Sequence, residues 1–247
     1  MKRNNLLKTL IASLLLMNVV SYAQDNKLTS KEKKAGWKLL FDGKTSKGWR
    51  SAKAATFPTG ENGWLIKDGM ITIQSANGAE SKNAGDIVSI GDYAAFELAF
   101  DFRLTKGANS GVKYFVTLKE NSNASAIGLE YQVLDDEVHP DAKLGRDGNR
   151  TIASLYDLKT SNKLNAVRPI GEWNTGKVIV NKNNHVEHWL NGVKVLEYER
   201  KSPEFRELVK QSKYKVWPNF GEADRGHILL QDHGDKVSFK NIKIKEL

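Results

Sequence analysis

The sequence predicts an all-β fold, in which two antiparallel sheets pack against each other as a jelly-roll sandwich with one short helix. Three observations support this class. About a dozen short segments are apolar or alternate between apolar and polar residues, which is the periodicity of strands. Glycine-rich turns separate these segments. One stretch carries the start signals of a helix, and the chain has no internal repeat and no low-complexity segment.

The first 23 residues have the pattern of a secretory signal peptide. Three basic residues lie among the first eight, an apolar run covers 10–20, and Ser21-Tyr22-Ala23 places small residues at the −3 and −1 positions of a cleavage site. The apolar run is too short to span a membrane as a helix. We therefore expect cleavage after Ala23 and a periplasmic or secreted protein.

The composition excludes several classes of protein. The chain has no cysteine, so it has no disulfide and no lipid-modified N-terminal cysteine, as is typical of a bacterial periplasmic protein. Three of the 38 basic residues lie in the signal peptide, and with 29 acidic residues the remaining chain has a net charge of about +6. This excess forms no basic-aromatic cluster, so we expect no nucleic-acid partner. No second apolar run is long enough for a membrane span.

The remaining chain is predicted to form a single domain. Residues 24–35 are polar and lysine-rich, and we expect a flexible lead-in there. Residues 36–247 then form the jelly-roll domain, because sandwiches of this length are commonly single domains. A core of this size is stable without disulfides.

The first strands of the domain are short. Two apolar runs flank Asp68-Gly69, which is a strong hairpin signal. Glycines bound another short strand. These expected strands cover 39–41, 64–66, 70–73 and 86–89.

The clearest strand covers 96–104, where five apolar residues occupy every second position. Arg103 lies on its other face and is a candidate substrate-binding group; a surface ion pair is the alternative. A turn at 106–111 predicts that 112–118 pairs back with this strand.

The next strand, 128–134, presents three apolar side chains on one face and Glu130 and Gln132 on the other. These two polar side chains lie about 7 Å apart along the strand, which suits neighbouring hydroxyls of one sugar ring. Asp135 and Asp136 follow in a loop. The alternative is a half-exposed strand with a solvated acidic turn.

The second half of the chain predicts a meander of hairpins joined by short Asn-containing turns. Ser202 and Pro203 supply the N-cap and the first position of the one convincing helix, which covers 202–210. The sequence leaves open which type of secondary structure the segment 152–158 forms. The expected strands cover 177–180, 185–190, 193–198, 228–231 and 237–244.

The five histidines form no compact metal-binding motif. His188 and His233 lie at strand ends, so both are candidate catalytic groups, and packing at a strand end is the alternative. His139 lies in the acidic loop, where carboxylates favour its charged form or its use as a ligand partner; an ordinary loop residue is the alternative. Trp173 is a candidate for stacking on sugar, although a large aromatic is more often core.

An ordered set of motifs along the chain resembles the 3-keto-disaccharide hydrolase domain family. The resemblance covers about 36–247. The motifs are Trp37-Lys38-Leu39-Leu40-Phe41-Asp42-Gly43-Lys44 with Gly48-Trp49, Asn109-Ser110-Gly111-Val112, Glu130-Tyr131-Gln132-Val133-Leu134-Asp135-Asp136, Ser154-Leu155-Tyr156-Asp157, Glu172-Trp173-Asn174, His188-Trp189-Leu190-Asn191-Gly192 and Gly226-His227-Ile228-Leu229-Leu230-Gln231-Asp232-His233-Gly234.

This resemblance implies a concanavalin A-like jelly roll that binds sugar, and a periplasmic enzyme that cleaves 3-keto-glycosides. Such a reaction requires a base for the C2 proton, positive charge or hydrogen-bond donors at the enolate oxygen, and an acid for the leaving oxygen. A divalent metal ion is one way to supply the electrophile, and its presence is left open. The expected catalytic residues are Glu130, His188 and His233, and the expected substrate-binding residues are Arg103, Gln132, Asp135, Asp136, Trp173 and Gln231.

The chain has no dinucleotide fingerprint, so we expect a separate sugar 3-dehydrogenase to supply the ketone. Two alternatives remain at this stage. One is a non-catalytic carbohydrate-binding module on the same fold. The other is an ordinary endo-glycosidase, against which the absence of a compact Glu-x-Asp-x-x-Glu motif argues.

Overall fold

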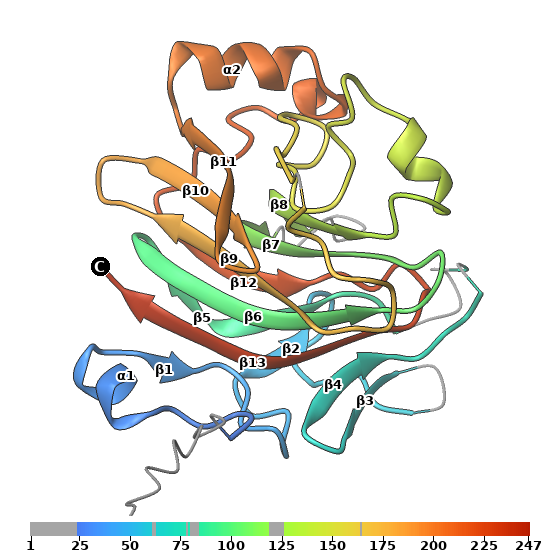
Figure 1. Ribbon diagram of the computed structural model, residues 1–247. Helices are drawn as coiled ribbons and strands as arrows, with labels where there is room; N and C mark the ends of the chain where they lie inside the picture. Colours follow the sequence, from blue (N-terminus) through green and yellow to red (C-terminus); the bar gives the residue numbers. More distant parts are fainter. Residues whose placement is uncertain (1–23, 61–62, 78, 80–83, 119–125, 164) are drawn as a thin grey trace, which may run out of the picture.

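Two antiparallel β-sheets pack face to face in the computed structural model, as the sequence predicts (Figure 1). The structure describes residues 24–60, 63–77, 79, 84–118, 126–163 and 165–247. The predicted signal peptide, residues 1–23, lies outside the described residues. No helix in the described ranges is long and apolar enough to cross a membrane.

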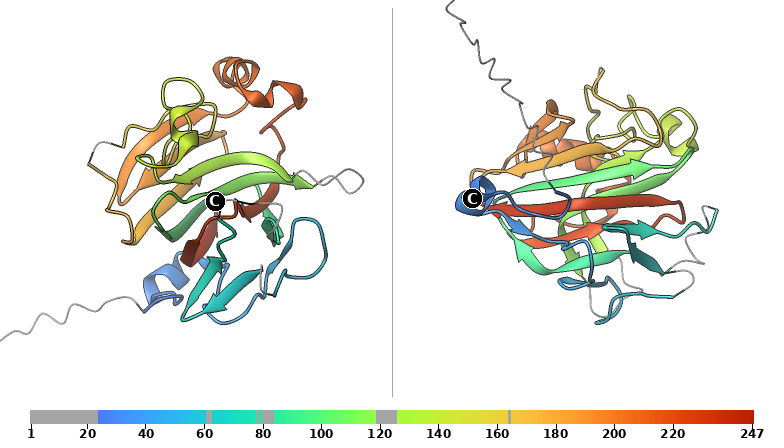
Figure 2. Two further views of the ribbon diagram at one scale, coloured as in Figure 1. Left: turned by 90° about the vertical axis from the view of Figure 1, so that its right-hand side faces the viewer. Right: turned by 60° about the horizontal axis from the view of Figure 1, so that its bottom comes forward.

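The larger sheet has the strand order β11-β10-β9-β6-β13-β4-β3, and β1 also pairs with β13. Figure 2 shows β13, in red, running through the middle of this sheet. Its strands are β1 (Lys38–Leu39), β3 (Trp64–Lys67), β4 (Met70–Ile73), β6 (Phe96–Leu104), β9 (Asn174–Val180), β10 (His185–Leu190), β11 (Val193–Glu199) and β13 (Val237–Glu246).

The smaller sheet has the order β2-β5-β12-β7-β8. Its strands are β2 (Trp49–Ser51), β5 (Ile87–Tyr93), β7 (Asn109–Leu118), β8 (Ala126–Leu134) and β12 (Gly226–Leu230). The predicted β3–β4 hairpin and the β9-β10-β11 meander are confirmed.

The core lies between the two sheets and follows from the alternation in β6 and β8. The apolar side chains of β6 are buried, and Phe100 meets Tyr131 of β8 edge to face, with 5.2 Å between ring centroids. Burial of such aromatic side chains contributes most of the stabilisation of a sandwich core. Because Tyr131 faces the core, its neighbours Glu130 and Gln132 face the opposite side of the smaller sheet.

The expected pairing of 112–118 with 96–104 is wrong. Strand β6 pairs with β9 and β13 in the larger sheet, whereas β7 pairs with β8 and β12 in the smaller sheet. The turn between them crosses from one sheet to the other, and the carboxylate of Asp135 accepts a hydrogen bond from Gly107 N–H there, at 2.7 Å. Both strands bury their apolar faces in the same core, but from opposite sides.

The predicted helix is confirmed as α2 (Pro203–Lys210), where Ser202 Oγ accepts from Phe205 N–H at 3.1 Å. Three short helical segments were not expected. They are α1 (Ser30–Lys34), η2 (Pro140–Lys143) and η3 (Lys213–Val216).

The N-terminal segment 24–35 differs from the expected flexible lead-in. Thr29 and Glu32 form a capping box for α1, and Glu32 pairs with Lys243 of β13. Asn26 is buried, and it exchanges two hydrogen bonds with Asn241, one at 2.6 Å and one at 2.9 Å. This segment therefore packs against β13 of the larger sheet.

Candidate active site

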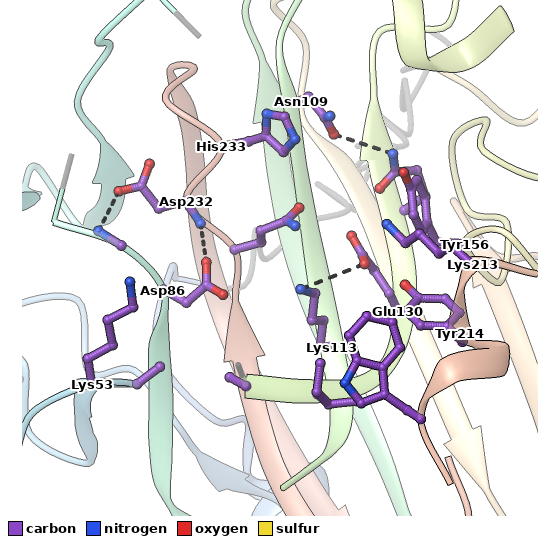
Figure 3. A pocket seen from close by; sticks show the side chains of 17 residues that line it. Lys53, Asp86, Asn109, Lys113, Glu130, Tyr156, Lys213, Tyr214, Asp232 and His233 are labelled. Carbon is purple, nitrogen blue, oxygen red and sulfur yellow. Dashed lines mark hydrogen bonds and ion pairs between the residues drawn. The ribbon is translucent and has the colours of Figure 1, made fainter. Parts of the chain in front are cut away.

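A cavity of about 580 Å³ lies on the face of the smaller sheet that points away from the core (Figure 3). Its volume is in the range of small-molecule sites. Strands β7 and β8 form its floor, η3 with Tyr156 and Trp217 forms one wall, and residues at the ends of β2, β5 and β12 form the other. The lining residues are Ala52, Lys53, Gly85, Asp86, Asn109, Lys113, Ala126, Ile127, Glu130, Gln132, Tyr156, Lys213, Tyr214, Trp217, Gln231, Asp232 and His233.

Glu130 lies on the floor and points into the cavity toward Lys113 (Figure 3). Its side chain is only 4% exposed, and its Oε2 lies 3.9 Å from Lys113 Nζ. Gly111 gives it room, because a Cβ atom at Gly111 would lie 2.2 Å from Glu130 Oε1. A glycine is therefore required beside this carboxylate.

The surroundings of Glu130 raise its pKa and make its carboxylate a stronger base. Burial raises the pKa of this carboxyl, and the positive charges of Lys113, Lys213 and His233 oppose that rise only in part. A carboxylate with a raised pKa accepts a proton more readily than an exposed one, which is how enzymes tune a general base.

Gln132 holds the Glu130 carboxylate in position. Its side chain is 1% exposed, and the sequence places it on the same face of β8. In the amide orientation that satisfies its neighbours, its nitrogen donates to Ser110 carbonyl at 3.0 Å and to Glu130 Oε1 at 3.2 Å. Both polar residues predicted from the strand alternation therefore reach one site.

The wall formed by η3 and residue 156 is aromatic and carries a lysine. Tyr156, Tyr214 and Trp217 line this side of the cavity, and aromatic faces suit the C–H faces of sugars. Lys213 Nζ lies 4.3 Å from the centroid of the Tyr156 ring. The Lys213 side chain keeps contact with solvent. Partial burial of its ammonium group nevertheless lowers its pKa.

The segment 152–158, whose type the sequence left open, extends the edge of β8. Ala153 N–H donates to Gln132 carbonyl at 2.8 Å, and Tyr156 N–H donates to Glu130 carbonyl at 3.0 Å. The Tyr156 hydroxyl donates to Asp141 Oδ2 at 2.8 Å. These bonds fix Tyr156 beside the catalytic candidate Glu130.

The opposite wall follows the end of β12. Gln231 and His233, both predicted site residues, line the cavity there. Gln231 N–H donates to Gly111 carbonyl at 2.9 Å, which ties this wall to the floor. Asp232 accepts from Gly85 N–H and Gly234 N–H, each at 3.0 Å, and so shapes the loop that presents His233.

His188 lies in the core between the sheets and not in the cavity. Its Nε2 lies 2.8 Å from Tyr114 Oη and its Nδ1 lies 2.9 Å from Ala153 carbonyl. Burial lowers the pKa of His188 to about 4, so the ring is neutral near pH 7. The strand pattern carried this signal, since His188 shares a face with Val186, and both are fully buried.

Four further predicted residues also lie outside the cavity. Asp135 binds the turn at Gly107, and Asp136 accepts from Ile152 N–H and pairs with Lys163. On the larger sheet, the Arg103 guanidinium lies 4.7 Å from the Trp173 ring centroid. The positions of Asp135, Asp136, Arg103 and Trp173 thus favour structural contacts over contacts with a ligand in this cavity.

Several residues that shape the cavity were not among the predicted site residues, and Lys113, Tyr156, Lys213 and Trp217 are examples. Lys113 lies between the buried Val112 and Tyr114, so the alternation along the strand predicts that its side chain points away from the core. Its partner was not predicted, because the strand was paired with the wrong neighbour; the observed register sets Lys113 opposite Glu130. Lys213 and Trp217 reach the cavity only through the tertiary fold.

The chain is similar to known proteins over most of its length. The sequence pattern of the 3-keto-alpha-glucoside-1,2-lyase-like domain matches residues 36–245. A curated relative from Bacteroides thetaiotaomicron, named 3-keto-disaccharide hydrolase, is 38% identical over 233 residues, which are 86% of this chain and 79% of the relative.

Two crystal structures from Parabacteroides distasonis, both described as candidate glycosyl hydrolases, share the fold. The first has a TM-score of 0.78 and 31% identity, and covers 91% of this chain and 100% of its own. The second has a TM-score of 0.63 and 25% identity, and the match covers 85% of this chain and 99% of the other. These matches confirm the predicted sandwich fold and the prediction of a glycoside-processing enzyme. The chain belongs to the family of 3-keto-alpha-glucoside-1,2-lyase-like domains.

Proposed function

We propose that this protein cleaves 3-keto-glycosides by removing the C2 proton, eliminating the C1 substituent and adding water to the product. The observation that carries this proposal is the buried carboxylate of Glu130, which faces a sugar-sized cavity with Lys113 3.9 Å away. The family pattern and the name of the Bacteroides thetaiotaomicron relative support the substrate class.

Glu130 acts as the base in this scheme. A ketone at C3 acidifies the C2 proton, so a carboxylate of raised pKa can remove it while the C–H electrons move into an enolate. The lysines at 113 and 213 provide positive charge in the cavity, where the enolate oxygen becomes negative. Gln132 keeps the carboxylate oriented.

The second half of the reaction breaks the bond from C1 to the glycosidic oxygen. The enolate electrons form a C1=C2 double bond and restore the C3 ketone, and the leaving oxygen takes a proton. Lys213 is suited to donate it, because its lowered pKa makes it a stronger acid than an exposed lysine. Water then adds its hydroxyl to C1 and a proton to C2, so the net reaction is hydrolysis.

The substrate must come from another protein. The chain carries no dinucleotide fingerprint, so a separate oxidoreductase would introduce the C3 ketone. We also propose that the protein works in the periplasm or outside the cell, on the basis of the signal-peptide pattern in residues 1–23.

The direct test uses p-nitrophenyl 3-keto-glucoside, in both anomeric forms, with the unoxidised glucoside beside it. The purified protein should release p-nitrophenol from the ketone alone, and Glu130→Gln should reduce the rate about 10²- to 10⁴-fold, as expected for loss of a general base. Glu97→Gln is the matched control, because Glu97 pairs with Lys245 on the larger sheet, away from the cavity. Release from the unoxidised glucoside at a similar rate would instead support an ordinary glycosidase.

A reaction in D₂O examines the chemical route. Elimination and hydration place deuterium at C2 of the product, which NMR detects, whereas direct displacement at C1 leaves C2–H intact. If folded protein binds the 3-keto-glucoside but neither releases the aglycone nor exchanges the C2 proton, a non-catalytic binding module explains the site better.

A further inference from the structure

Three side chains of types that can ligate a metal ion meet at the edge of the cavity. His139, His233 and Asp235 each offer one ligand atom, and these atoms all lie within 4.8 Å of one another. His139 comes from the loop after β8, whereas His233 and Asp235 follow β12, so the fold joins residues that are distant in the sequence. Two imidazoles and one carboxylate form a donor set that suits divalent transition metals.

The fold orients each of these groups. Asp235 Oδ2 accepts from Asn109 N–H at 3.1 Å, which fixes the carboxylate beside the first residue of β7. The rings of His139 and His233 lie nearly perpendicular, with 6.0 Å between centroids, so their nitrogens can approach one ion from two directions. Hydrogen bonds to ligands of this kind hold metal sites in place.

His233 also lines the catalytic cavity, so an ion at this cluster would lie beside bound sugar. Figure 3 places His233 next to Asn109 at the edge of the cavity that holds Glu130. Three protein ligands leave coordination positions open for oxygens of a substrate. The location therefore suits catalysis more than structural support alone.

Binding has one identifiable cost. His139 Nδ1 accepts from Asp141 N–H at 3.2 Å. A metal ion needs a lone pair on the ligating nitrogen, so either Nδ1 turns toward the ion, or Nε2 binds and Nδ1 takes the proton. Either change breaks this long hydrogen bond, and the cost reduces the metal affinity.

We propose that His139, His233 and Asp235 bind one divalent transition-metal ion at the edge of the Glu130 cavity. Resting on the proposed function, the inference assigns to this ion the stabilisation of negative charge on the substrate's C3 oxygen, together with the lysines. The ion would stabilise the same enolate that forms when Glu130 removes the C2 proton.

A second group of similar composition provides the control. His185, Glu187 and Glu197 also lie within range of one ion, on β10 and β11 of the larger sheet. These side chains are engaged in ion pairs: His185 Nδ1 lies 2.6 Å from Glu199, and Lys194 Nζ lies 2.6 Å from Glu197. None of them lines the cavity.

Metal binding is measured without any substrate. The purified protein is treated with a chelator, dialysed and titrated with Co²⁺, and the visible absorption of the bound ion and the heat of binding are recorded. We expect one equivalent to bind, and His139→Ala, His233→Ala and Asp235→Asn each to weaken binding at least tenfold. His185→Ala should bind as the wild type does. No binding, or binding lost in His185→Ala and kept in the other three, overturns the proposal.

Activity then separates this inference from the proposed function. With p-nitrophenyl 3-keto-glucoside, Co²⁺ or Mn²⁺ should raise the rate of the chelated protein at least tenfold. Full activity in the chelated protein would support the proposed function and overturn the metal inference. Co²⁺ binding through the three residues, with no cleavage of any 3-keto-glycoside, would establish the site and contradict the proposed function.

Discussion

The carboxyl group of Glu130 is 4% exposed, and its pKa is raised because burial disfavours the charged form. Folding therefore favours the protonated acid, whereas the proposed reaction requires the carboxylate. Lys113 and Lys213 reduce this conflict by placing positive charge near it. Functional groups commonly cost stability in this way, since the same burial that tunes a base weakens the folded state.

Glu130→Gln should stabilise the protein at neutral pH while it removes activity. In the unfolded chain Glu130 titrates at its ordinary value of 4.5, and in the folded protein the pKa is higher. The stability contribution of this group is complete below 4.5 and is lost as pH rises through the folded pKa. The variant should thus melt higher than wild type at pH 7 and equally below 4.5.

Thermal melts across pH 4 to 8 check this expectation for both proteins. The acid limb of the wild-type activity profile should also lie above 4.5, because the base must be ionised. A variant that melts lower than wild type at pH 7 would show that the pairing with Lys113 outweighs the cost of burial.

For single residues, the sequence predicted the face of the strand on which each side chain lies. Glu130 and Gln132 were found because side chains alternate along β8, and their neighbour Tyr131 had to face the core. His188 and Asp135 were misplaced because their roles depend on partners far along the chain, at Tyr114 and Gly107. Such partners leave no local periodic signal.

At the scale of elements, the β7–β8 ladder builds the floor of the site. Its register sets Gly111 opposite Gln132 and Lys113 opposite Glu130. The pairing of β7 with β8 therefore brings Gly111, which has no side chain, and the Lys113 ammonium next to the Glu130 carboxylate. The sequence identified both strands but assigned β7 to the wrong neighbour, because a short turn after β6 favours a hairpin unless the chain crosses between sheets.

Gly111→Ala should lower activity about 10²-fold without unfolding the protein. A Cβ atom would lie 2.2 Å from Glu130 Oε1, so the carboxylate must shift, and a misplacement of about 1 Å can cost this much in rate. Release of p-nitrophenol from the 3-keto-glucoside and a thermal melt measure the two effects.

Gly128→Ala is the matched control on the same ladder. Its Cβ atom would meet Val116 Cγ2 at 2.7 Å and Tyr114 carbonyl at 2.8 Å, so it strains the same two strands without touching Glu130. Its folded fraction should keep its activity. Equal losses of activity in the two variants would assign the effect to strain in the ladder.

For the whole molecule, the sequence predicted the sandwich but not the sorting of strands between its sheets. Alternation in β6 required a buried face, and the turns required antiparallel neighbours. Nothing local shows that β6 and β13 are neighbours, although they pair from Val237 to Glu246. Long-range pairing depends on the total burial of all the strands together, which no single segment encodes.

Deleting residues 237–247 should prevent folding altogether. Strand β13 lies between β6 and β4, pairs with β1, and buries Val237, Phe239, Ile242 and Ile244. Each such side chain contributes about 1.5–3 kcal/mol, and domains are stable by only about 5–15 kcal/mol. Circular dichroism and soluble yield test this.

Deletion of Leu247 alone should leave the fold intact, because that residue adds one hydrogen bond, from its N–H to Ala95 carbonyl at 3.0 Å. A soluble protein with a cooperative melt after the longer deletion would mean that the larger sheet closes without its middle strand.

The central position of β13 also sets the time at which this chain can fold. Strand β13 follows β1, β4 and β6 in the sequence, so a ribosome makes these three strands before their shared partner. A nascent chain that cannot close its larger sheet stays extended longer. That delay suits a precursor that has to be threaded through a translocation channel before it folds, as the export proposed from residues 1–23 would require.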